Sequence, residues 1–353
     1  MRVVTITDNH LGGGLETRIQ VCLRRAAAHL ILAERTAPGS PADPAEIASF
    51  RPIGLALKAK VLAERIIAAD ADIVDLHPFH ALVTGLLAAC LAGRPAMLTL
   101  HGPTSLRPPA AEWQRAVFER LMSEARPCLI VVSEEVRAAA EALFPAARIA
   151  LVANGVLPSG RALPDNGRRI AMATRLDVDK QAGIWEVLRL MRRAPWVRLD
   201  LFGDGSARSD VEREIRRLGL SARVRVWGHV DQPAAVFPRR AVVAGCGRAL
   251  LEGLVQGRRG LVVSGTRLVG PVRRDGWRHL AKSNFSGRGV AATQQAEVLA
   301  WLRARPSSRD RVVDLVPTDM AARYARLAMA EIGAADPEHL RQAGAAALAV
   351  LPG

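Results

Sequence analysis

Short apolar strands alternate with helices along most of this chain, and the alternation constrains its fold more than any other feature. From Arg168 to Glu252 the sequence runs strand, helix, strand at the spacing of a parallel α/β layer. The same alternation occupies residues 1–157, so the 353 residues are expected to form two domains, each able to bury a core. Parallel sheets bind ligands beyond the carboxyl ends of their strands, so we expect site residues in those loops.

The boundary between the domains is expected where the strand and helix patterns stop. Residues 157–168, LPSGRALPDNGR, have the composition of a linker. We therefore expect an N-terminal domain over residues 1–160 and a C-terminal domain over residues 168–316. Residues 317–353 are predicted to form C-terminal helices, and packing on the N-terminal domain is one arrangement open to them.

Other segments carry local patterns. Gly12 to Gly14 follow the first strand and open a helical pattern that runs to about Leu32. Residues 36–52 are rich in Pro, Ala and Ser and are predicted to be a loop. Residues 53–70 have apolar residues at helical spacing; a core helix with a solvated face is favoured, and membrane contact stays open. Residues 266–289 carry many cations and few periodic patterns, so we expect an irregular segment there.

The net charge of +15 invites a nucleic-acid interpretation, but its distribution argues against one. Residues 1–157 hold 16 Arg and Lys against 15 Asp and Glu, so nearly all the excess lies in the second part of the chain. Aromatic residues are few and are not interleaved with the arginines, as base stacking would require. A basic surface that attracts anionic substrates or anionic lipid stays open.

The cysteines and the apolar segments bear on location. Cys22, Cys90, Cys128 and Cys246 lie far apart and form no CxxC pair, which fits a reducing compartment. The chain starts directly with a strand and shows no signal-peptide pattern. Its longest apolar run, Ala81 to Gly93, is too short for a bilayer, which needs about 20 residues. We expect a cytoplasmic protein, with peripheral contact at the inner face of the membrane as an open alternative.

Several catalytic motifs do not occur in the sequence. No GxGxxG follows the first strand and no GxxxxGK[ST] is found, which argues against a dinucleotide dehydrogenase and a P-loop NTPase. Two Asp-x-Asp pairs, Asp70/Asp72 and Asp177/Asp179, have the oxygens that a divalent ion prefers. A solvated loop explains the first pair better, and the second can tune nearby cations. We therefore expect neither a metal nor a cofactor.

The strongest candidate site lies in the second domain. Arg175 and Lys180 stand five residues apart after a strand, and a pair of cations suits the oxygens of a diphosphate. A glycine turn at Gly203 follows the next strand, and a helix that begins near Gly247 offers backbone donors that attract anions. Glu252, on the second turn of that helix, has the chemistry to accept hydrogen bonds from vicinal sugar hydroxyls. Together these features indicate half of a nucleotide-sugar site.

These motifs, in this order, resemble those of the family 4 glycosyltransferases, which are retaining enzymes of the GT-B fold. The resemblance covers about residues 1–265. It rests on GGLE (Gly13 to Glu16), a strand, helix and strand that end in His101-Gly102, ANGV, ATRLDVDK, LFGDG, RVRVWGHV and GRALLEGLVQG.

The resemblance implies an α/β protein with two Rossmann-like domains that face an interdomain cleft. The two cations would stabilise the leaving diphosphate, and His101 would hydrogen-bond the donor sugar. The residues to which it assigns catalysis are His101, Arg175 and Lys180. The residues to which it assigns donor binding are Gly13, Gly14, Arg175, Lys180, Gly203, Gly247, Arg248 and Glu252.

One departure from the family pattern stands out. The family's Glu-x7-Glu motif would need a glutamate at position 244, where this chain has Ala244. A subset of the family resembles this chain in having Gly-Arg, as at Gly247-Arg248, and a later segment like Asn284 to Gly289. The identity of the donor sugar therefore stays open.

We predict a metal-independent, retaining hexosyltransferase. It would move a sugar from a nucleoside-diphosphate sugar to a glycan or lipid-linked acceptor in bacterial cell-surface polysaccharide or glycolipid synthesis. The alternative, motivated by Ala244, is a catalytically weak nucleotide-sugar-binding subunit of a glycan-synthesis complex. A polyanion-binding protein would rest on the isoelectric point alone, and we expect no nucleic-acid partner.

Overall fold

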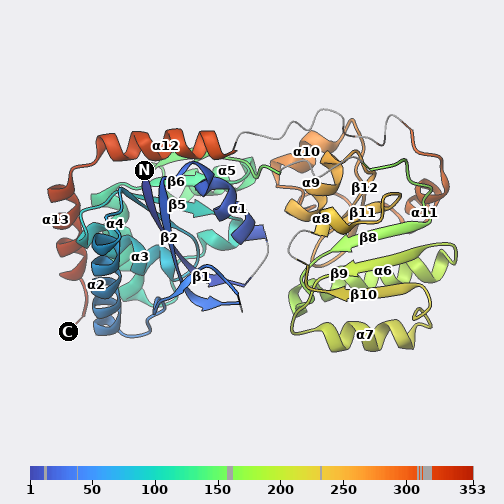
Figure 1. Ribbon diagram of the computed structural model, residues 1–353, viewed down its shortest axis with the longest axis horizontal. Coiled ribbons are helices and arrows are strands. Elements are labelled where there is room, and N and C mark those ends of the chain that lie inside the picture. Colours follow the sequence, from blue (N-terminus) through green and yellow to red (C-terminus); the bar gives the residue numbers. More distant parts are fainter. Residues whose placement is uncertain are drawn as a thin grey trace. The chain divides into compact units, whose positions relative to one another are not determined.

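The computed structural model describes residues 1–11, 14–37, 39–156, 162–230, 233–307, 310, 312 and 320–352. The chain divides into two compact units, Met1–Asn154 with Asp319–Gly353, and Gly155–Thr318. Each unit has one mostly parallel sheet with helices against it (Figure 1).

The first unit is built on a seven-stranded sheet in the order β3-β2-β1-β4-β5-β6-β7, and each neighbouring pair runs parallel. Its strands are β1 (Arg2–His10), β2 (Ala28–Thr36), β3 (Asp43–Pro44), β4 (Ile73–Leu76), β5 (Ala96–Leu100), β6 (Cys128–Val131) and β7 (Arg148–Leu151). Its helices are α1 (Gly14–Cys22), η1 (Leu23–Arg25), α2 (Pro52–Ala68), α3 (Ala81–Leu91), η2 (Pro103–Leu106), α4 (Glu112–Ala125), α5 (Glu134–Leu143), α12 (Met320–Ala334) and α13 (Pro337–Leu348).

Central strands of this sheet are buried on both faces. All residues of β4 and β5 are buried, as expected for parallel strands with helices on either side. Helix α3 is buried on nearly every face and packs against α2 and α13, which explains its uninterrupted apolar sequence. Helix α5 begins at the predicted cap, where Ser133 Oγ accepts a hydrogen bond from the backbone N of Val136 at 3.4 Å.

The helix predicted from the glycines to about Leu32 is wrong. Helix α1 ends at Cys22, and Ala28–Thr36 form strand β2, which pairs along β1. Leu32 itself is fully buried in the core. Its Ala, Leu and Glu neighbours favour a helix in isolation, but pairing with β1 outweighs this weak local preference.

Two other segments hold more structure than their composition indicated. The loop predicted over residues 36–52 contains the two-residue strand β3, which pairs with β2. The segment over 266–289 contains β13 (Leu268–Pro271) and α10 (Trp277–Lys282). All three elements are too short to show a clear period in sequence.

The helices at the end of the chain belong to the first unit. Helix α12 packs on α1 and η1, and α13 packs on α3 and α4. Arg148 at the start of β7 pairs with Glu331 of α12 at 2.5 Å. The chain thus leaves the first unit after β7 and rejoins it at α12.

The second unit has a six-stranded sheet in the order β10-β9-β8-β11-β12-β13, parallel except for β13. Its strands are β8 (Arg169–Ala173), β9 (Arg198–Phe202), β10 (Val224–Gly228), β11 (Val242–Gly245), β12 (Gly260–Val263) and β13. Its helices are η3 (Val178–Lys180), α6 (Gln181–Arg193), α7 (Arg208–Arg217), α8 (Pro233–Val236), α9 (Gly247–Val255), α10 and α11 (Gln295–Arg303).

Each sheet reverses its strand order beside its first strand. Strand β1 lies between β2 and β4, and β8 lies between β9 and β11. At such a point the helices that follow neighbouring strands leave on opposite faces, so the loops at the carboxyl ends separate and leave room for a ligand. The loops after β1, β4, β8 and β11 are therefore where this topology favours a site.

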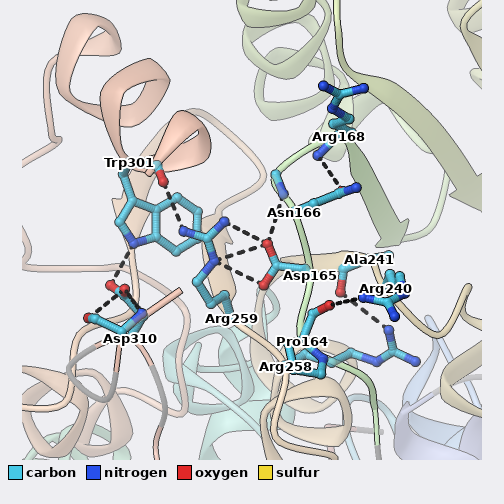
Figure 2. A network of polar contacts seen from close by, with 12 residues as sticks. Pro164, Asp165, Asn166, Arg168, Arg240, Ala241, Arg258, Arg259, Trp301 and Asp310 are labelled. Carbon is cyan, nitrogen blue, oxygen red and sulfur yellow. Dashed lines mark hydrogen bonds and ion pairs between the residues drawn. The ribbon is translucent and has the colours of Figure 1, made fainter. Parts of the chain in front are cut away.

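A buried ion pair anchors the second unit near both of its ends (Figure 2). Arg259 donates to Asp165 through Nη2 at 2.6 Å, and both side chains are nearly fully buried, at 1% and 4% exposed. Arg259 Nη1 also donates to the carbonyl oxygen of Trp301, at 2.8 Å, and Trp301 Nε1 donates to Asp310 at 2.8 Å. One guanidinium thus ties the segment that enters the unit to the segment near its end.

Replacing Arg259 by Met should destabilise this unit strongly, because Asp165 would stay buried without its partner. The expected loss is about 3–5 kcal/mol of unfolding free energy, measured by urea denaturation. Arg217→Met is the matched control, because Arg217 pairs with Glu214 on the surface and such pairs contribute at most about 1 kcal/mol. Equal losses in the two variants would contradict the anchoring role.

Candidate functional site

The loop after β8 brings the two predicted cations together. Lys180 Nζ lies 3.0 Å from Asp179 Oδ2, and Arg175 Nη2 lies 3.3 Å from the same oxygen. Arg175 also pairs with Asp177. The side chain of Arg175 is 60% exposed, so its ion pairs are weak and can be exchanged for those of an incoming anion. The two cations are therefore close to each other and held by aspartates.

The loop after β9 contacts the loop after β8, and this close contact requires a glycine. Gly203, which follows β9, has φ of +143°, and a Cβ there would lie 1.8 Å from the carbonyl oxygen of Thr174. Backbone hydrogen bonds join the loops: Thr174 N donates to Phe202 O at 3.0 Å, and Leu176 N donates to Asp204 O at 2.9 Å. Gly203 therefore shapes the cation loop through its backbone.

Asp177 links the glycine turn to the cations. Its Oδ1 accepts hydrogen bonds from the backbone N and from Oγ of Ser206, both at 3.0 Å. Burial by itself would raise the pKa of Asp177, but these hydrogen bonds and the charge of Arg175 lower the pKa overall. The carboxylate is therefore ionised at neutral pH and keeps both loops in place.

The start of α9 lies close to the segment over residues 284–289. Gly247 has φ of +59°, and its backbone N donates to the carbonyl oxygen of Phe285 at 3.2 Å. Asn284 and Phe285 both have the left-handed backbone conformation, with φ of 53° and 54°. The N–H of Gly247, predicted as a donor for a ligand, is thus already used within the chain.

Arg248 and Glu252 form a pair on one face of α9. Arg248 Nε donates to Glu252 Oε1 at 2.7 Å, and the side chains are 12% and 17% exposed. Arg248 Nη1 is buried and has no hydrogen-bond partner among the residues that the structure describes. Buried donors are seldom left unsatisfied, so this atom is a candidate contact for a bound molecule.

Cys246 shows that the cation loop and α9 share one neighbourhood. Burial raises the pKa of its thiol, while the positive charges of Lys180, Arg288 and Arg175 act in the opposite direction. Strands β8 and β11 are parallel neighbours, so the residues after their carboxyl ends lie at one edge of the sheet. The second unit thus gathers its predicted cations and the start of its glycine-led helix at the carboxyl ends of β8 and β11.

Ala244 lies inside the sheet and not at its edge. It is fully buried in β11, where it pairs with Met172 of β8 and Leu261 of β12. A carboxylate at this position would be enclosed by the core and unable to reach a ligand. The site of this chain is therefore built without a side chain from position 244.

The loop after β1 carries the predicted glycines of the first unit. Gly13 lies outside the described residues, and Gly14 begins α1. Glu16, 8% exposed, accepts a hydrogen bond from the backbone N of Leu11 at 2.9 Å. This glutamate thus links the residue after β1 to the first turn of α1.

His101 directly follows β5 and contacts a second histidine. Its Nε2 lies 2.7 Å from Nδ1 of His77, and His77 Nε2 lies 3.1 Å from Asp75 Oδ2. Asp75 and His77 are each 1% exposed. Burial lowers the pKa of His101 far below its usual range, and the charges of His77 and Arg18 lower it further. His101 is therefore neutral at pH 7.

With this geometry described, the chain can be compared with known proteins. Residues 13–159 match the model described as Glycosyltransferase Family 4. The match covers less than half of the chain and is consistent with a family 4 glycosyltransferase. No curated protein sequence matches the chain.

Solved structures extend the likeness over nearly the whole chain and show that the fold is GT-B. A glycosyltransferase from Rickettsia africae has a TM-score of 0.62 at 15% identity, over 95% of this chain and 99% of its own. Sucrose-phosphate synthase from Thermosynechococcus elongatus has a TM-score of 0.64 at 16% identity, over 95% and 100%. HepE from Anabaena, in complex with UDP-glucose, has a TM-score of 0.58 at 20% identity, over 94% and 100%. The predicted α/β, GT-B class is confirmed.

The two Asp-x-Asp pairs form ion pairs with arginine and lysine side chains. Asp70 and Asp72 pair with Arg2 at the start of β1, and Asp177 and Asp179 pair with the cation loop. Within the described residues, no group of three or more His, Cys, Asp or Glu side chains is arranged to hold a metal ion. In the same part of the chain, no helix is long and apolar enough to cross a bilayer.

Sequence reasoning missed the partners of two predicted site residues. Asp75 and His77 stand in the motif DLH at the end of β4, and parallel pairing of β4 with β5 brings His77 beside His101. The sequence could have indicated this contact, because each histidine directly follows a strand and the two strands were expected to be parallel. The pairing of Arg248 with Glu252 was also readable, because residues four apart face each other on a helix.

The lowered pKa of His101 predicts a loss of stability in mild acid. The unfolded chain binds a proton near pH 6.5 and the folded chain does not, so the stabilising contribution is complete above pH 6.5 and declines as pH falls below it. In His101→Gln the free energy of unfolding should therefore fall less steeply with acidification. The difference in slope should be up to about 1.4 kcal/mol per pH unit between pH 6.5 and 5.5, measured by urea denaturation. His29→Gln, on the surface, should leave the slope unchanged; an unchanged slope in His101→Gln too would contradict a neutral, partly buried His101.

Proposed function

We propose that this chain transfers a sugar from a nucleoside-diphosphate sugar to a glycan or lipid-linked acceptor, with retention of anomeric configuration, in bacterial cell-surface polysaccharide or glycolipid synthesis. Its family and its GT-B fold are those of glycosyltransferases. The observation that carries the proposal is the gathering of Arg175, Lys180 and the start of α9 at the point where the second sheet reverses its strand order.

The cations supply what bond cleavage at the anomeric carbon needs. Negative charge develops on the departing diphosphate, and preorganised positive groups stabilise it most where water is partly excluded. Arg175 and Lys180 would exchange Asp177 and Asp179 for phosphate oxygens, and Arg248 Nη1 would gain the partner that it lacks. This arrangement supports a reaction that uses no metal to neutralise the leaving group.

Donor contacts of the other predicted residues follow from their positions. Glu252, oriented by Arg248, would accept hydrogen bonds from the ribose hydroxyls. His101 would contact the donor sugar, and Gly13 and Gly14 would let backbone N–H groups approach it. HepE has been solved with UDP and UDP-glucose, which favours a nucleotide-sugar donor for this chain as well.

A peripheral membrane contact in the cytoplasm is part of the proposal. On α2 the side chains of Ile53, Leu57 and Val61 are 72%, 60% and 56% exposed, and Phe50 just before the helix is 81% exposed. Lys60 is exposed on the same helix. Such an apolar row with a cation suits the surface of an anionic membrane, where a lipid-linked acceptor would be found. The four cysteines are free thiols, as a reducing compartment would keep them.

A catalytically weak nucleotide-sugar-binding subunit is the alternative, and it is favoured by Ala244, whose position offers no side chain to the donor. Binding of a nucleotide is common to both functions. Turnover separates them.

Donor hydrolysis with a panel of UDP-, GDP- and ADP-sugars tests the proposal. One donor should be hydrolysed slowly, and Lys180→Ala should reduce kcat/KM by about 10²- to 10³-fold, because it removes a charge that acts on the leaving group. Lys282→Ala, on α10 and not part of the predicted site, is the matched control and should behave as wild type. Nucleotide binding without turnover of any donor, even with lipid acceptors, would establish the binding subunit instead.

A further inference from the structure

His101 is connected through His77 to Asp75, which lies within the sheet. Strands β4 and β5 are parallel neighbours, so residues after their carboxyl ends lie side by side. His77 and His101 occupy these places, and their rings lie 5.0 Å apart between centroids with an interplanar angle of 30°. Behind them, Asp75 sits within β4 and accepts a hydrogen bond from Thr99 Oγ1 of β5 at 3.4 Å. A carboxylate and two imidazoles thus form one connected row.

The order of these groups restricts where protons lie. A carboxylate oxygen only accepts hydrogen bonds, so the contact with Asp75 requires a proton on His77 Nε2. At pH values where His77 is neutral, its Nδ1 is then an acceptor, and His101 Nε2 donates to it. Nδ1 of neutral His101 is left without a proton. No residue in the described part of the chain donates to this atom.

The other charged and titratable groups around the row come from two further elements. Arg18 of α1 is 1% exposed, and its positive charge disfavours a second proton on His101. Tyr324 of α12 is also 1% exposed, and burial, together with the charge of Asp75, raises the pKa of its phenol well above the usual value. Tyr324 is therefore a neutral phenol.

We propose that Asp75 and His77 are positioning residues that hold His101 as the Nε2–H tautomer, so that its Nδ1 accepts a hydrogen bond from a hydroxyl of the bound ligand. The tautomer of His101 determines which chemical groups can bind at Nδ1. A sugar hydroxyl can donate to Nδ1, whereas an ionised phosphate oxygen cannot. His101 therefore selects a polyol group and does not bind the diphosphate. The identity of that hydroxyl as part of a donor sugar rests on the proposed function.

The tautomer can be measured without any substrate. Long-range ¹H–¹⁵N NMR spectra of the full-length protein, labelled with ¹⁵N-histidine, report which ring nitrogen carries the proton. At pH 7.5 we expect both His101 and His77 to carry their proton on Nε2 and none on Nδ1. His101→Gln and His77→Gln assign the resonances. A protonated Nδ1 on His101 would overturn the proposal, whether or not the protein is an enzyme.

Asp75→Asn tests the positioning role. An asparagine can donate as well as accept, so the proton of His77 is no longer confined to Nε2. His101 should then populate both tautomers in the NMR spectra, and kcat for donor hydrolysis should fall by about 10- to 100-fold with KM for the donor changed less than about threefold. His29→Gln, at an exposed site, should change neither quantity.

Two results would count against the positioning role. One is a folded Asp75→Asn variant that keeps the wild-type His101 tautomer. The other is a variant with mixed tautomers and an unchanged kcat. Failure of the proposed function is a separate result: a wild-type protein that hydrolyses no donor but has the expected tautomer contradicts glycosyl transfer and retains the assignment of His101 Nδ1 as a hydroxyl acceptor.

Discussion

The carboxyl ends of the parallel strands in the two sheets determine where this fold favours a ligand site. Parallel pairing places the ends of neighbouring strands at one edge, and the reversal of strand order at β1/β4 and β8/β11 separates the loops there. Every described candidate residue follows the carboxyl end of a strand or lies within the first two turns of the helix that comes next. Gly203 depends on the same geometry, because only a residue without a side chain lets its loop contact the loop after β8.

In the cation loop, charges are paired before any ligand arrives. Asp177 and Asp179 hold Arg175 and Lys180 in place, and a diphosphate would take over these contacts without requiring the loop to form anew. Exposed ion pairs contribute little, so the exchange costs little, whereas the buried Arg259–Asp165 pair is fixed and serves the fold. Arginine–aspartate pairs thus have different roles in one unit, according to their burial.

Much of the fold could be predicted from sequence, because buried parallel strands such as β4 and β5 are uninterrupted apolar runs. Strand β2 could not, since its Ala, Leu and Glu residues favour a helix and only its pairing with β1 makes it a strand. Arg175 and Lys180 were found because they are close in sequence. Asp75, His77 and the partners of Arg259 were missed, since their contacts depend on strand pairing or join residues up to 94 positions apart.

The central claim is that the loop after β8 binds a diphosphate, and calorimetric titration tests it most directly. UDP, GDP and ADP would be compared with uridine, guanosine and adenosine. At least one diphosphate should bind, with its nucleoside weaker by about 100-fold or more, because charge-assisted contacts to phosphate provide most of the affinity. A nucleoside that binds as tightly as its diphosphate, or the binding of none of these ligands, would contradict the account.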